Sequence, residues 1–166
     1  METPSFTGGF FFFALCYDSS MRKKLLVIIV AVTLLVVGYS FLNKKTIDAT
    51  EVLTIGNATV LYERADTEAL RTQGLSGTTY LSEAEGMLFV YDAPTIPRFW
   101  MKDMNYPIDI IWISAEKKVI GFEEAVHPDT FPATFSPDTP VQYVLEVHSG
   151  FTRRANVDVG TLVEGI

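Results

Sequence analysis

The sequence predicts a mostly β domain: a compact, small barrel-like fold of about seven or eight short strands with one or two short helices, preceded by one N-terminal transmembrane helix. Three observations lead to this prediction. Residues 25–42 form an uncharged apolar run that spans about 27 Å as a helix, close to the thickness of a bilayer's hydrocarbon core. Downstream, short apolar runs alternate with glycine- and proline-containing turns. Helical patterns are too few there for a doubly wound sheet.

The N-terminal part of the chain has the pattern of an export signal. Residues 1–20 contain no basic residue, whereas Met21 is followed directly by Arg22, Lys23 and Lys24 and then by the apolar run. We therefore expect residues 1–20 to be an upstream extension. The alternative is a short segment at the membrane surface.

Residues 21–42 are predicted to be a signal anchor. The positive-inside rule then places the N-terminus in the cytoplasm and the C-terminal domain outside, in a single-pass protein of the cell membrane held through residues 25–42. The alternative is a signal peptide cleaved after Ser40, which would release a secreted domain.

Charge and cysteine content exclude several classes of function. The chain has a net charge of −7, and from Thr46 onward 8 lysine and arginine residues stand against 18 acidic ones. This acidity argues against nucleic acid as a partner. The single Cys16 excludes an intramolecular disulfide and a cysteine-based metal site. His127 and His148 lack the spacing of zinc ligands, so we predict neither metal nor cofactor.

The first half of the domain is punctuated by recognisable turns. Residues 43–49 are predicted to be a tether, and residues 50–166 the domain. Gly56-Asn57 favours a hairpin between strands 52–55 and 58–63, because both residues tolerate positive φ. Residues 67–73 are predicted to be a helix that begins at a capping threonine or aspartate and stops at Gly74.

The second half continues with strands and loops. The apolar run 86–91 has strand length, and two prolines favour a loop over 92–97. Four prolines favour a long loop over 126–140, and an Asp-Val-Gly turn leads into a final strand within 157–163. The remaining predicted strands are 98–102, 108–113, 119–124 and 142–147.

Two acids interrupt otherwise apolar strands. Asp109 is the single polar residue in 108–113, so its carboxylate must find donors or a cation. It would either cap backbone amides of the loop 103–107 or serve in a functional site. Glu146 is the single charge in 143–147 and either lies on a half-exposed strand face or is a semi-buried acid facing a pocket. Together they are weak candidates for a catalytic acid/base pair.

Residues 98–102 alternate between two kinds of side chain. Phe99 and Met101 fall on one face and are expected in the core, whereas Trp100 shares the other face with Arg98 and Lys102. Trp100 and Lys102 would either line a ligand cleft or pack simply against each other. The predicted ligand-binding residues are therefore Trp100, Lys102, Asp109 and Glu146.

An ordered set of short motifs resembles a known family. The motifs are Gly74-Leu75, residues 86–90 (GMLFV), 99–102 (FWMK), 107–111 (PIDII), 143–146 (YVLE), Gly150 and Gly160. Over most of residues 50–163 this set resembles the DUF192 family, also called UPF0127. The resemblance implies a compact, mostly β domain that is often exported or membrane-anchored, and it implies no catalytic assignment.

Three functions fit these observations. The chain has no assembled catalytic motif, which favours a binding or accessory module for a small ligand or an envelope partner. A small envelope hydrolase that uses Asp109 and Glu146 as acid and base is the enzymatic alternative. The third is a purely structural domain of a membrane complex. Whether the protein is an enzyme is left open by the sequence.

Overall fold

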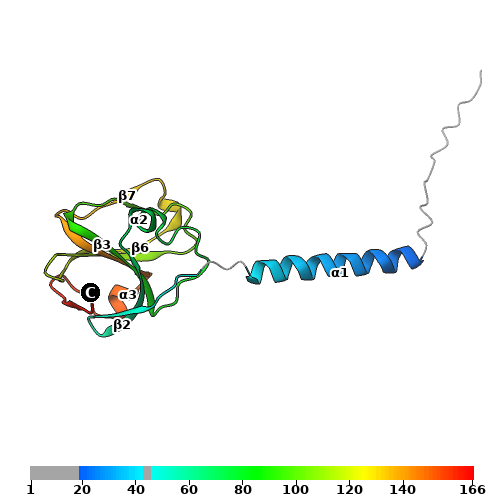
Figure 1. Cartoon of the computed structure of the whole chain (residues 1–166), viewed down its shortest axis with the longest axis horizontal. Coiled ribbons are helices and arrows are strands. Elements are labelled where there is room, and N and C mark those ends of the chain that lie inside the picture. Colours follow the sequence, from blue (N-terminus) through cyan, green and yellow to red (C-terminus); the bar gives the residue numbers. More distant parts are fainter. Residues whose placement is uncertain (1–18, 43–45) are drawn as a thin grey trace, which may run out of the picture. The chain divides into compact units, whose positions relative to one another are not determined.

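The structure is a computed structural model and describes residues 19–42 and 46–166. The chain divides into two compact units, residues 1–43 and 44–166 (Figure 1). The prediction for residues 1–18 and the start of the predicted tether lie outside the described residues.

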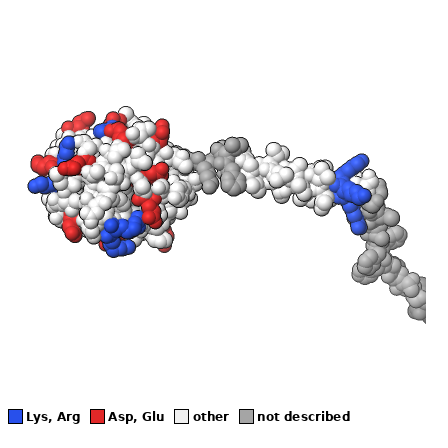
Figure 2. Space-filling view, turned by 90° about the horizontal axis from the view of Figure 1, so that it is seen from below, with Lys and Arg blue, Asp and Glu red and all other residues white. Residues whose placement is uncertain are grey.

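The first unit contains one long helix, α1 (Ser19–Leu42), which includes the apolar run expected to be helical. Basic side chains gather near its start (Figure 2). Among the described residues, however, no helix has both the length and the apolar character needed to cross a membrane. The structure thus gives no support to the transmembrane helix that the sequence predicts.

The second unit is mostly β, as the sequence predicts. Seven strands form one sheet in the order β6-β5-β8-β3-β2-β1-β9, and β4 pairs with β7 in a separate ribbon. The strands are β1 (Glu51–Ile55), β2 (Ala58–Ala65), β3 (Glu85–Thr95), β4 (Phe99–Trp100), β5 (Ile108–Ile113), β6 (Val119–Val126), β7 (Thr134–Phe135), β8 (Val141–His148) and β9 (Val163–Glu164). The helices of this unit are α2 (Glu68–Gln73), the 3-10 turn η1 (Pro128–Thr130) and α3 (Phe151–Arg154).

The sheet curls until its two edges meet, which confirms the barrel-like form. Lys118 next to β6 forms a bridge with Leu162 next to β9. The amide of Val119 donates a hydrogen bond to the carbonyl of Thr161 at 2.9 Å, and Gly160 donates to Val119 at 2.8 Å. These bonds pair both edges of the sheet and leave less unpaired backbone exposed.

Two apolar cores lie on the two faces of the curled sheet. The core inside the barrel includes Tyr62, Leu88 and Phe151 of α3, which lies at one side of the sheet (Figure 1). The core outside it includes Phe89 and Trp112, and it is joined by Leu75 from the segment after α2 and by Phe99 and Phe135 of the β4–β7 ribbon. Strand β5 contributes to both cores, so all six of its residues are buried.

Several predicted boundaries need correction. The predicted loop 92–97 is largely strand, because β3 continues through Pro94 to Thr95 after a shift in its register with β8, where a missing amide is tolerated. The predicted strand 98–102 is shortened to β4, and the predicted loop 126–140 contains η1 and β7. The hairpin 52–63 and the helix 67–73 are confirmed within a residue or two at each end.

Candidate functional site

Of the two positions that the sequence leaves open for Glu146, a half-exposed strand face or a semi-buried site, the structure shows a buried one. Glu146 lies near the end of β8, opposite Met87 of β3 and Ile110 of β5, and its side chain points into the outer core together with Val144. The residue is 5% exposed. Its Oε2 atom is buried and has no hydrogen-bond partner. A buried carboxyl oxygen without a partner is rare and costly, and a missing ligand is one explanation for it.

Glu146 lines a small cavity, which we call the inner recess. Its volume is about 60 Å³, and its walls come from α2, β3, β4 and the segment after β4. The aromatic and basic side chains on these walls are Arg71, Phe89, Tyr91, Arg98, Phe99 and Trp100, and Met104 also lines the recess.

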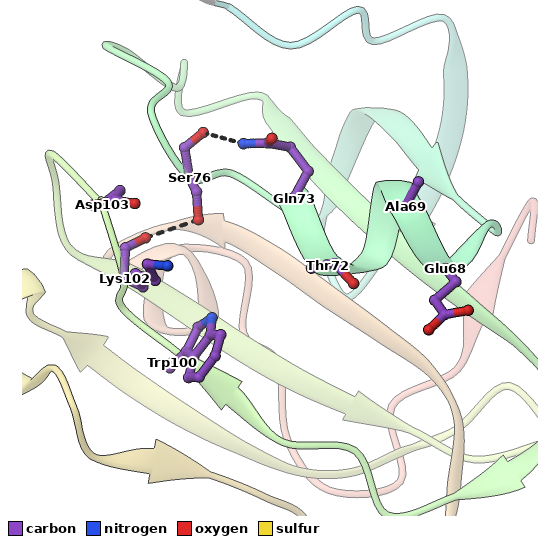
Figure 3. Close-up of a pocket in the computed structure, with 8 residues that line it drawn as sticks. All are labelled: Glu68, Ala69, Thr72, Gln73, Ser76, Trp100, Lys102 and Asp103. Atoms are coloured by element: carbon purple, nitrogen blue, oxygen red, sulfur yellow. Dashed lines mark hydrogen bonds between the residues drawn. The ribbon is translucent and has the colours of Figure 1, made fainter.

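A larger and more open cavity, which we call the outer cavity, adjoins the recess. Its volume is about 690 Å³. Trp100 and Lys102 lie on its β4 side and Glu68 and Thr72 on its α2 side (Figure 3). The two cavities share the lining residues Thr72, Gln73, Ser76 and Trp100, so together they form one cleft that leads from the surface towards Glu146.

Local sequence signals place α2 over this cleft. The Thr67 side chain accepts a hydrogen bond from the amide of Leu70, which caps the start of the helix. Gly74 ends it with a φ of 48°, a value that favours glycine. A Cβ on Gly74 would lie 3.4 Å from the Phe89 ring, so the small residue also lets the end of the helix approach the recess closely.

Hydrogen bonds fix the two sides of the cleft to each other. The hydroxyl of Ser76 donates to the carbonyl of Lys102 at 2.8 Å, and the side-chain amide of Gln73 donates to the carbonyl of Ser76 at 2.8 Å (Figure 3). The amide of Gly77 donates to the carbonyl of Asp103 at 2.8 Å. Hydrogen bonds from both side chains and the backbone therefore fix the position of the segment after α2 relative to the segment after β4.

Strand β4 divides its two aromatic residues between core and cleft. Phe99 is buried and forms edge-to-face contacts with Phe89 and Trp112, at centroid distances of 4.8 and 5.6 Å. Trp100 is 48% exposed and forms an edge-to-face contact with Phe131, with a centroid distance of 6.2 Å. The alternation expected from the sequence thus places the Trp100 indole at the mouth of the recess.

Burial controls the ionisation of the acidic and tyrosine side chains in and near the recess. It raises the pKa of the Glu146 carboxyl to about 8, so this side chain holds its proton at neutral pH. Burial also raises the pKa of Tyr91, against the opposing effect of Arg71, and the pKa of Tyr106. The recess therefore presents a neutral carboxylic acid, which can both donate and accept a hydrogen bond.

Asp109 has a different environment. Its Oδ1 accepts hydrogen bonds from the amides of Ala125 at 2.9 Å and Gly150 at 3.1 Å. Its Oδ2 accepts from the amide and the hydroxyl of Thr152, at 3.0 and 2.8 Å. The side chain is fully buried and caps the start of α3 from the neighbouring strand. Asp109 therefore does cap backbone amides, but they belong to residues 125, 150 and 152 and not to the loop 103–107 that the sequence predicted.

The structure does not bring Asp109 and Glu146 together. Asp109 pairs with Val147 and Glu146 with Ile110 in the β5–β8 register, and side chains alternate along a strand. The two carboxyl groups therefore leave opposite faces of the sheet, which leaves no shared site for an acid and a base. Trp100, Lys102 and Glu146, by contrast, line the one cleft.

Sequence reasoning did not single out Arg71, Tyr91, Arg98 and Met104, which complete the recess. They come from α2, β3 and the segments on either side of β4. Only Arg98 is linked by its spacing to a predicted site residue, because alternation places it on the same strand face as Trp100. Within residues 19–42 and 46–166, no cluster of three or more histidine, cysteine or acidic residues is suited to hold a metal ion.

Comparison with known proteins identifies relatives of the whole β unit. The model of the family DUF192, described as "Uncharacterized ACR, COG1430", matches residues 51–165. A protein of unknown function from Novosphingobium aromaticivorans has 27% identity and a TM-score of 0.65, over 68% of this chain and 83% of its own. A protein described as a putative transcription regulator from Sinorhizobium meliloti has 26% identity and a TM-score of 0.67, over 73% and 98%. No curated protein matches.

Proposed function

This chain belongs to the DUF192 family, and we propose that its β domain is a binding module for a small organic ligand, held in the cleft between α2 and β4. The observation that carries the proposal is the Oε2 atom of Glu146, which is buried without a partner in the inner recess of that cleft. A ligand group in the recess would supply the missing hydrogen bond.

The shape and lining of the cleft support a small ligand. The outer cavity has a volume within the usual range of about 300–1,000 Å³ for ligand sites. Binding sites of this kind combine aromatic walls with a few polar groups that fix orientation. Trp100, Phe99 and Tyr91 provide such walls here, and Glu146 provides the polar group at the inner end.

Thermal unfolding of the full chain in neutral detergent tests this function. A panel of small organic acids, amines and sugars is added at millimolar concentration, since binding to the folded state raises the unfolding midpoint. We expect a shift with one class that is lost in Trp100→Ala. Tyr80→Ala is the matched control, because Tyr80 is an exposed aromatic residue that lines neither cavity. A shift that persists in Trp100→Ala would contradict binding in this cleft.

We further propose that residues 25–42 hold the protein at the cell membrane, with the β domain outside the cytoplasm. The proposal rests on the uncharged run and on the basic residues Arg22, Lys23 and Lys24 before it. Cell fractionation tests it. We expect the full chain in the membrane fraction after a high-salt wash, and the mass of the purified protein will show whether the segment is cleaved. Recovery of an intact chain in the soluble fraction would contradict the proposal.

A further inference from the structure

The charge of the inner recess restricts the ligand that it can accept. Resting on the proposed function, we infer that the ligand is a small organic acid. Its carboxylate enters the recess and accepts a hydrogen bond from Glu146, and its apolar body lies against Trp100 in the outer cavity. The inference follows from the charges, the donors and the dimensions of the cleft.

Two cations and one acid line the recess. The cations are Arg71 and Arg98, and Glu146 is the one acidic residue among the lining side chains. Among residues 19–42 and 46–166, neither arginine forms an ion pair. With Glu146 neutral, the recess thus carries positive charge that a bound anion would complement.

The contacts of Arg71 leave its charge uncompensated. One guanidinium nitrogen donates to the backbone carbonyls of Asp66 and Val90, at 2.5 and 2.8 Å. The guanidinium carbon lies 5.1 Å from the centre of the Tyr91 ring. Carbonyl groups and an aromatic face hold the guanidinium in place without neutralising its formal charge. Arg71 therefore fixes a positive charge at the wall of the recess.

Glu146 supplies a donor suited to an anion. Burial keeps this carboxyl protonated at neutral pH, so it has one O–H to donate. A hydrogen bond from a neutral acid to a carboxylate is charge-assisted and stronger than one between neutral groups. An ammonium group would meet the opposite situation, because both arginines would repel it.

Because the recess is small and the outer cavity is large, a ligand would place a small head group in the recess and a larger body in the outer cavity. The recess has room for only a few atoms, since about 60 Å³ is little more than the space of a few water molecules. A planar carboxylate fits this space. The body must then remain in the outer cavity, where Trp100 is half-exposed and offers an aromatic face.

Titration of the full chain with three matched probes tests the inference, by ligand-observed NMR at millimolar concentration in neutral detergent. The probes are phenylacetate, its amide phenylacetamide and benzylamine. We expect phenylacetate to bind most tightly. Above about pH 8 its affinity should fall about tenfold per pH unit, because an ionised Glu146 repels the carboxylate. In Glu146→Gln the amide still donates a hydrogen bond, so binding should persist without this fall.

Comparing the pH profiles of the wild type and Glu146→Gln separates the effect of Glu146 from that of the other charged and titratable groups near it. They are Tyr91 of β3, Tyr106 after β4, the two arginines and, on the same face of β8, His148. All of them are present in both proteins, and burial moves the tyrosines' pKa values further above neutrality. The difference between the two pH profiles therefore reports on Glu146 alone.

Two further variants complete the test. Glu146→Leu should weaken phenylacetate at least tenfold, and Arg98→Gln should weaken phenylacetate more than phenylacetamide. Glu83→Gln, an exposed matched control, should change neither. Tighter binding of benzylamine, loss of binding in Glu146→Gln, or unchanged binding in Glu146→Leu would overturn the organic-acid inference but not the ligand-binding function. Failure of all three probes to bind would overturn both.

Discussion

Replacing Glu146 should change how the stability of the protein depends on pH. The folded protein holds a proton on Glu146 up to about pH 8, whereas the unfolded chain releases it near the ordinary pKa of 4.5. Stability must therefore be highest below about pH 4.5 as far as this group is concerned, fall between about pH 4.5 and 8, and level off above that. Each pH unit in this window costs about 1.4 kcal/mol, which amounts to roughly 5 kcal/mol over the whole interval.

Glu146→Leu removes this dependence, because leucine has no proton to release. At pH 8 the variant should be more stable than the wild type by several kcal/mol, since it also fills an apolar site without an unpaired oxygen. Glu146→Gln should give an equally flat profile at a lower level than leucine. Its buried amide would still lack partners, at a cost of about 1–3 kcal/mol.

Urea unfolding at several pH values between about 5 and 8.5 measures this effect. Both tryptophans of the chain, Trp100 and Trp112, lie in the β domain, so their fluorescence reports on its unfolding in the full chain. Glu51, whose pKa Arg64 lowers to about 2, affects stability only at more acidic pH. Glu83→Gln is the control and should run parallel to the wild type.

Parallel stability profiles for the wild type and Glu146→Leu across this pH window would contradict the prediction. Such profiles would mean that the Glu146 carboxyl ionises in the folded protein at its ordinary pKa and that the recess is well solvated. The charge argument for an organic acid would then lose its neutral donor.

Three further predictions concern stability and the cleft. Asp109→Asn should lower the free energy of unfolding by about 2–4 kcal/mol in urea, because an amide nitrogen would face at least one backbone amide donor; an unchanged midpoint would contradict the capping role. Gly56→Ala should lower the thermal midpoint far more than Gly77→Ala. A Cβ at Gly56 would lie 2.2 Å from a backbone carbonyl oxygen, whereas one at Gly77 meets nothing within 4 Å. Equal losses in the two variants would show that the loss of stability comes from positive φ alone and not from this clash. Trp100→Ala should leave the free energy of unfolding in urea within about 0.5–1 kcal/mol of the wild type, because the side chain is half-exposed, and a larger loss would make Trp100 a core residue.

Much of the fold follows from local sequence signals. Gly56-Asn57 and Gly74 mark the first hairpin and the end of α2, because each position requires or tolerates positive φ. The pattern of β5, which is apolar at every position except Asp109, indicates burial on both faces, and residues of β5 do pack in both cores. The four-residue helix α3 was missed because one turn is too short to show helical periodicity.

Long-range pairing explains the remaining errors. Strands β4 and β7 have two residues each and pair across more than thirty positions, so no local pattern predicts them. The extension of β3 through Pro94 depends on its partner β8, which reaches Thr95 only after a register shift. Candidate site residues show the same limit. Alternation pointed to Trp100 and Glu146 and placed Arg98 on the face of Trp100, but Arg71 and Tyr91 enter the cleft only through tertiary packing.

The contrast between Asp109 and Glu146 is the strongest reason to look for function in the cleft. Both acids interrupt apolar strands that pair directly, and both are buried. Asp109 has four donors for its two oxygens, so its burial is explained by the fold alone. Glu146 has a buried oxygen with no donor among the described residues, and burial raises its pKa, so we expect it to lower stability near neutral pH. A residue that weakens the folded state and sits in a recess of a surface cleft is what a binding site requires and what a purely structural domain does not.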